Sequence, residues 1–365
     1  MGEREKGVTS ISVENAKLFV FEALKSVGTP DEAAFLCADV LIEADRRGHF
    51  SHGMNILHKI LMDIMRNLID CKAQPEILSE SPSTAWIDGK NGLGPVVADF
   101  CMQLAIKKAK EVGFAVVSAK GSSNPSIMGY WSEYALKHDC IGMTFTNAAP
   151  MMVPTRAKEG AVGPNPIAFA APSHGNDSFS LDMATSTVSG GKIEICRRKR
   201  EPLVKGWAFN EKGILETDSE IAVKKMLLVP LGGLENTAGY KGYGLSCMVE
   251  IFCGILSGSK FGPQLDIWSE DRTEPADVGH CFMAINIENF APYFRDRLHD
   301  LLLTHRKCEP VDLSKPVLIP GDPARMYRKK VAKQQGIRYS QQQINTCQIF
   351  ANILGIKPLQ CQTSN

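Results

Sequence analysis

The chain has 365 residues, which is long enough for a large hydrophobic core and two sub-domains. Its hydrophobic fraction of 44% and charged fraction of 22% are ordinary for a globular protein, and its formal net charge of +1 excludes a broad field that would attract nucleic acid or an acidic membrane. Eleven cysteines without a C-x-x-C pair are typical of reduced thiols. With a charged N-terminus and no long apolar run, these features predict a cytoplasmic protein without a membrane span.

The first seventy residues are predicted to be helical. Ser12 can cap a first helix, and Thr29 can cap a second helix because proline follows it and Glu32 stands three residues later. A third helix is expected from Ser51 to Met65.

Strand and helix patterns then alternate, which favours a mixed α/β layer structure. The expected strands are residues 84–88, 114–117, 141–145 and 282–287, and the expected helices are residues 96–112, 130–138, 244–256, 293–304 and 341–354.

One segment imitates the dinucleotide fingerprint G-x-G-x-x-G. Gly92 and Gly94 follow a predicted strand and open a predicted helix, but Val97 occupies the place of the third glycine. Ala119-Lys120 stands at the end of the next strand, where a carboxylate would bind the ribose. A standard Rossmann site is therefore not expected.

Two other segments combine small residues and glycines with a fixed charge. One is residues 181–186 followed by Gly190-Gly191-Lys192, and the other is residues 239–245. Small residues let the backbone approach a ligand, and free N–H groups in a turn can hold phosphate oxygens beside a lysine. Either segment alone fits an ordinary turn, but the pair predicts a pocket for a phosphorylated cofactor.

Eight short segments in a fixed order resemble the malate/L-lactate dehydrogenase family, whose members bind NAD or NADP on a non-Rossmann fold. The resemblance runs from about residue 8 to about residue 355, and the segments that carry it are residues 47–53, 88–94, 146–150, 163–166, 181–186, 206–208, 230–233 and 239–245. It implies an α/β fold with a mixed sheet and a helical domain built from both chain ends.

The same resemblance implies the division of the chain and its partners. Residues 1–75 plus 290–360 would form the helical and dimerisation part, and residues 76–289 the α/β cofactor-binding part. The expected partners are a small-molecule substrate and a second copy of the chain in a homodimer.

The reaction of this family moves a hydride between a substrate carbon and a nicotinamide ring, so a nearby group must carry the hydroxyl proton and a cation should hold the substrate carboxylate. His52 matches the family's pattern, whereas Ile56, Ile60 and Asn124 stand where arginine, tyrosine and histidine are usual. The spacing of residues 52, 56 and 60 would place them on one helix face that looks into the active site. Losing a positioned acid or base costs about 10²–10⁴ in rate, so the usual turnover should be reduced.

The cofactor side departs less from the family's pattern, although Pro164 replaces the usual threonine of that motif. The resemblance implies that one set of residues lines the pocket for NAD or NADP, namely Asn147, Asn165, Asp182, Met183, Ala184, Thr185, Lys241, Gly242, Tyr243 and Gly244.

Two functions follow from this pattern. The first is an NAD(P)-dependent oxidoreductase that acts on small 2-hydroxy or 2-oxo acids, and the second is a catalytically silent dinucleotide-binding protein or partner subunit. The basic run Arg197-Arg198-Lys199-Arg200 is interpreted as a solvated loop rather than as a nucleic-acid patch. No spacing of His, Cys, Asp or Glu predicts a metal site.

Overall fold

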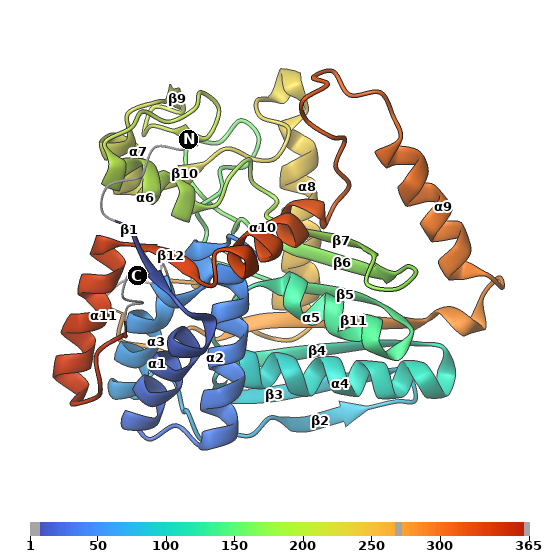
Figure 1. Cartoon of the computed structure of the whole chain (residues 1–365), viewed down its shortest axis with the longest axis horizontal. Coiled ribbons are helices and arrows are strands. Elements are labelled where there is room, and N and C mark those ends of the chain that lie inside the picture. The colour runs from blue at the N-terminus through green and yellow to red at the C-terminus, as the bar shows by residue number, and fades with distance from the viewer. Residues whose placement is uncertain (1–7, 267–271, 361–365) are drawn as a thin grey trace.

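A seven-stranded sheet forms the centre of the computed structural model, which describes residues 8–266 and 272–360 (Figure 1). The strands lie in the order β2-β3-β4-β11-β5-β6-β7. Their bounds are Glu76–Glu80 (β2), Thr84–Gly92 (β3), Phe114–Ser122 (β4), Cys140–Thr146 (β5), Ile167–Pro172 (β6), Ser178–Met183 (β7) and Val278–Asn286 (β11). Of these pairs β3 and β4 are parallel and the others are antiparallel, so the predicted mixed sheet is confirmed.

Helices cover both faces of this sheet. The alternation of side chains along β11 directs Phe282 and Ala284 into the core beneath α4 (Gly94–Val112) and α5 (Met128–Tyr134). Cys281 and Met283 point to the opposite face and pack with Val249 and Cys253, which belong to α8 (Gly239–Glu250) and to the π-helical turn Ile251–Ile255. The sheet is therefore buried on both sides at its centre.

The two ends of the chain meet in a second core beside the sheet. Strand β1 (Val8–Ile11) pairs antiparallel with β12 (Ile337–Ser340). The helices that share this core are α1 (Val13–Ser26), α2 (Asp31–Arg46), α3 (Leu57–Met65) and α11 (Gln341–Leu354), with α10 (Asp322–Lys333) beside them. By contrast, α9 (Phe294–Arg306) is tied by ion pairs to Asp139 and Asp177 of the α/β part. The division of the chain near residues 75 and 290 stays a prediction.

A small lobe lies beyond the sheet and carries α6 (Gly190–Lys199) and α7 (Ser219–Lys225) (Figure 1). Its three short strands are β8 (Ala208–Phe209), β9 (Leu215–Glu216) and β10 (Leu227–Leu228), in the order β10-β8-β9. Ile193, Ala208 and Leu228 form its core. The lobe places the first turn of α6 against the turn that carries His52, as described below.

Three local predictions concern the ends of helices. Ser12 caps α1, because its hydroxyl accepts a hydrogen bond of 3.0 Å from the Asn15 N–H. The predicted cap at Thr29 is wrong: α2 begins after Pro30, and the Thr29 hydroxyl is buried without a partner. The predicted loop at residues 197–200 is also wrong, because α6 continues to Lys199, and Arg197 and Arg198 both pair with Glu194.

Within residues 8–266 and 272–360, no helix is long and apolar enough to cross a membrane. The ten cysteines in these ranges are free thiols.

Candidate active site

His52 lies in a broken turn rather than in a continuous helix. Two 3₁₀ turns, Phe50–His52 and Met54–Ile56, precede the regular helix α3. The predicted single helix from Ser51 to Met65 is therefore wrong in its first half, and His52, Ile56 and Ile60 do not lie along one regular helix. Gly53 is the point of the break.

The buried carboxylate of Asp45 holds this break in place. Its Oδ2 accepts hydrogen bonds from the Met54 N–H at 2.9 Å and from the Tyr339 hydroxyl at 2.8 Å. A Cβ at Gly53 would lie 1.9 Å from Asp45 Oδ1, so only glycine fits there. The carboxylate thus joins α2, the His52 turn and the C-terminal strand β12.

We expect the stability of the protein to depend on pH through the Asp45 carboxyl. Burial raises its pKa from 3.8 to about 7, although the hydrogen bonds from Met54 and Tyr339 act in the opposite direction. Because the pKa in the folded state exceeds that in the unfolded state, the stabilisation is complete below about pH 4 and is lost as the pH rises through about 7. The difference in unfolding free energy between wild type and Asp45→Asn should shrink by at most roughly 4 kcal/mol over this range. Urea unfolding of both proteins at pH 4.5, 6 and 8 measures it, and a constant difference would contradict it.

The electrostatic surroundings keep the His52 imidazole neutral near pH 7. Burial lowers its pKa, and the charge of His49 lowers it further, whereas Asp182 raises it. The Nδ1 atom lies 2.9 Å from the Ser51 hydroxyl. Burial also raises the pKa of Asp182, against the hydrogen bond from Gly129 and the charges of Arg47 and His52. Each of the two groups thus changes the protonation of the other.

Asn124 belongs to the same neighbourhood. Its Oδ1 accepts a hydrogen bond of 2.8 Å from the Ser126 N–H, and the Ser126 hydroxyl donates to the His52 carbonyl at 2.7 Å. At the second residue of α5, the Gly129 N–H donates to Asp182 Oδ2 at 2.9 Å. The structure therefore brings His52, Asn124 and Asp182 together from three separate segments.

The loop that carries Asn124 also packs against Gly94, in the segment that resembles a dinucleotide fingerprint at the start of α4. A Cβ at Gly94 would lie 2.3 Å from the Asn124 carbonyl oxygen, and the Gly94 N–H donates to the Ser123 hydroxyl at 2.8 Å. Strand β3, α4 and β4 do form a parallel β-α-β unit, but residues 123–124 cover the helix end where a Rossmann protein holds its pyrophosphate. Gly94 serves close packing of the chain.

Ile56 and Ile60 are buried in the helical core, with exposed fractions of 9% and 4%. They pack in the cluster that includes Leu24, Leu41 and Leu61. A substrate carboxylate would find no polar group on either side chain.

On the cofactor side, a chain of backbone hydrogen bonds joins the two glycine-containing segments. The Leu231 N–H donates to the Thr185 carbonyl at 2.9 Å, and the Gly242 N–H donates to the Leu231 carbonyl at 3.2 Å. Gly242 permits this approach, since a Cβ there would lie 2.4 Å from the Leu231 backbone. Residues 190–192 and 239–245 are not the ordinary turns that either segment alone would fit, because they begin the helices α6 and α8.

The residues of these two segments range from fully buried to exposed. The Thr185 hydroxyl is buried without a partner, which costs free energy unless a ligand or water completes it. Lys241 and Gly244 are exposed at the start of α8, and the space beside Gly244 is free of other atoms within 4 Å. Asp182, Met183 and Ala184 are half-buried at the end of β7. Tyr243 is half-buried, and its hydroxyl interacts with Cys247.

The side chains of Asn147 and Asn165 form hydrogen bonds with other residues of the protein. Their side-chain N–H groups donate to Glu250, at 3.4 Å from Asn147 and 2.6 Å from Asn165. Their oxygens accept from the N–H groups of Gly279 and Ala148, both at 2.9 Å. These two residues tie the loops that carry them to Glu250 and to the start of β11.

The sequence did not indicate two contacts of this site. Asp182 was predicted to bind cofactor only, and its proximity to His52 depends on the fold. Gly191 packs directly on the His52 turn, because a Cβ there would lie 2.4 Å from the Ser51 Cβ. The glycine pair 190–191 was the available signal, since adjacent glycines permit close approach of two backbones.

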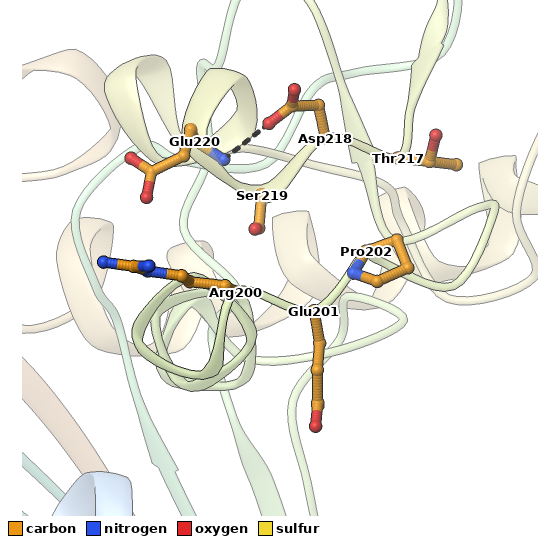
Figure 2. A pocket seen from close by; sticks show the side chains of 7 residues that line it. All are labelled: Arg200, Glu201, Pro202, Thr217, Asp218, Ser219 and Glu220. Atoms are coloured by element: carbon orange, nitrogen blue, oxygen red, sulfur yellow. Dashed lines mark hydrogen bonds between the residues drawn. The ribbon is translucent and has the colours of Figure 1, made fainter.

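A separate pocket of about 620 Å³ lies in the small lobe, where Figure 2 shows its lining side chains. It is lined by residues 200–202 and 217–220, and none of them is a predicted site residue. Among the described residues, no group of three or more His, Cys, Asp or Glu side chains could hold a metal ion.

The comparisons with known proteins agree with this fold. Residues 11–348 match the profile described as malate/L-lactate dehydrogenase. The chain is 42% identical to a malate dehydrogenase of Pyrococcus abyssi over 78% of each protein, and 36% identical to an L-sulfolactate dehydrogenase of Methanocaldococcus jannaschii over 94% of this chain and 96% of the relative. A malate dehydrogenase structure from Entamoeba histolytica superposes with a TM-score of 0.91 at 29% identity, covering 96% of this chain and 99% of that one. The chain belongs to the malate/L-lactate dehydrogenase family.

Proposed function

We propose that this protein is an NAD(P)-dependent oxidoreductase that acts on small 2-hydroxy or 2-oxo acids. One observation carries the proposal: Asp182 lies near enough to His52 to raise its pKa. The segment that holds Asp182 continues to Thr185, whose buried hydroxyl has no hydrogen-bond partner in the described part of the chain. Relatives named for malate and sulfolactate point to acids with a second anionic group.

The residues present fit a nicotinamide dinucleotide. Thr185 offers a buried donor, and Lys241 offers a cation at the start of a helix, where N–H groups favour phosphate. The bound nicotinamide would supply the hydride exchange with the substrate carbon.

The protein's own contribution is the movement of the hydroxyl proton. A neutral His52 can accept it at Nε2 when the alcohol is oxidised and return it when the ketone is reduced. Asp182 stabilises the imidazolium formed in this way, because its negative charge raises the pKa of His52. Ser51 holds the other ring nitrogen and so fixes the orientation of the imidazole.

Ile56, Ile60 and Asn124 reduce this activity in our proposal. Asparagine cannot take up a proton near neutral pH, and isoleucine cannot hold a carboxylate. A protein with an intact nucleotide pocket and no turnover, acting as a silent binding partner, is the second candidate. The burial of Ile56 and Ile60 in an apolar core favours it.

Nucleotide binding tests the function shared by both candidates. Titration with NADH and with NADPH, followed by fluorescence, should show saturable binding of at least one nucleotide. Lys241→Met should raise its Kd about tenfold, since a charge-assisted contact contributes about 1.5–3 kcal/mol. The exposed Lys224, on α7, supplies the control Lys224→Met, which should bind like wild type. If neither nucleotide binds, the proposed function is wrong.

An exposed apolar surface after α8 could form the interface of the homodimer that the resemblance implies. Ile251, Ile255 and Leu256 follow α8 and are 58%, 55% and 55% exposed. We propose that a second copy covers them. Ile255→Glu should convert the dimer to monomer in light scattering coupled to gel filtration, whereas Ile214→Glu, at a 59% exposed isoleucine of the small lobe, should not. A monomeric wild type would contradict the proposal.

A further inference from the structure

The site as described lacks a cation for the substrate carboxylate. Arg47 is near, since its charge lowers the pKa of Asp182, but its guanidinium is already paired with Glu43 and Glu133 at 3.0 and 2.9 Å. Glu43 and Glu133 also pair with Arg328, but the Arg47 guanidinium is buried and its N–H groups are directed to these two carboxylates rather than to a substrate. An anchor for the substrate carboxylate must therefore be a cation without such partners.

Lys192 meets this condition. It follows Gly191, whose α-carbon packs against Ser51 beside His52. Among the residues that the structure describes, it forms no ion pair: the carboxylate on its own helix, Glu194, is taken by Arg197 and Arg198. Its ammonium lies 5.8 Å from the centroid of the Trp207 ring.

The positive charge of Lys192 acts on His49, which stands three residues before His52. The pKa of His49 is lowered by partial burial of the ring and then by the positive charges of Arg47 and Lys192. His49 in turn lowers the pKa of His52. Because Gly191 packs on Ser51, the Lys192 side chain leaves the backbone one residue from the turn that carries His52.

We propose that Lys192 anchors the substrate carboxylate and takes over the role that Ile56 cannot perform. The inference deepens the proposed function and rests on it. The ligand is an oxo-acid anion, held by a point charge rather than by a planar fork, so selection among acids should be loose. A phosphate of the nucleotide could use the same charge, and the test below separates the two anions.

Calorimetric titration with oxalate, an unreactive analogue of a 2-oxo acid, tests the proposal with and without saturating NADH. Wild type should bind oxalate, and Lys192→Met should weaken binding ten- to a hundredfold while its affinity for NADH stays within twofold. Lys192→Arg should restore most of the affinity. Lys199→Met, at an exposed lysine of the last turn of α6, should match wild type.

Three results would overturn this assignment: no oxalate binding by wild type, unchanged binding by Lys192→Met, or a loss confined to NADH. A failure of the proposed function is recognised separately, because it appears as a wild type that binds neither NADH nor NADPH. Oxalate binding that persists in such a protein and depends on Lys192 would support the anchor alone.

Discussion

Replacing His52 with alanine should lower the turnover of a 2-oxo acid by about 10²–10⁴, which is the usual cost of losing a positioned acid or base. The affinity for NADH should change less than twofold, because His52 contacts Ser51 and neighbours Asp182 rather than the start of α8. Steady-state kinetics with oxaloacetate, together with fluorescence titration, measure the two quantities on one preparation.

The dependence on pH adds a second readout for His52. Because burial lowers its pKa below the ordinary 6.5, the neutral base should persist below that pH, and alcohol oxidation should fall only at more acidic pH. His305→Ala, at an exposed histidine in the last turn of α9, is the control and should retain turnover. Equal losses in both variants would show that the effect does not come from the His52 imidazole.

Gly53→Ala should be among the most damaging small substitutions in the chain. Its methyl group would meet the Asp45 carboxylate at 1.9 Å, and both Gly53 and Asp45 are buried. Relief requires movement of either the His52 turn or the carboxylate that binds Met54 and Tyr339. Overpacking of this kind costs about 1–3 kcal/mol, and turnover should fall as well because His52 moves. Thermal unfolding and activity assays measure both.

A double substitution provides the control. Asp45→Ala removes the carboxylate that the new methyl group strikes, although it also removes two hydrogen bonds. The cost of Gly53→Ala should therefore be smaller in the Asp45→Ala background, as expected for coupled neighbours. Strictly additive costs would mean that the clash is not the cause.

The sequence predicted the architecture well where local patterns determine it. The Ser12 cap and the helix Gln341–Leu354 were predicted from neighbouring residues alone, and both were confirmed. The family resemblance, now shown, supplied the mixed sheet. Pairing of β11 between β4 and β5 could not be deduced from local patterns, because it joins residues more than a hundred positions apart.

The site was harder to predict because its geometry depends on long-range contacts. Periodicity suggested one helix through His52, Ile56 and Ile60, whereas the buried Asp45 carboxylate imposes a break at Gly53. Asn147 and Asn165 carry polar groups that suit a ligand, but Glu250 engages both. Their residue types were visible in the sequence, and only the fold shows which of their atoms are already in use.

A single-turnover experiment tests the central claim most directly. Wild-type protein loaded with NADH, or with NADPH if that binds better, is mixed with oxaloacetate, and the loss of nucleotide absorbance is followed beside His52→Ala. Our account predicts tight nucleotide binding, slow oxidation in wild type and none above background in the variant. Absence of binding to either nucleotide, or oxidation that proceeds equally well without the His52 imidazole, would contradict it.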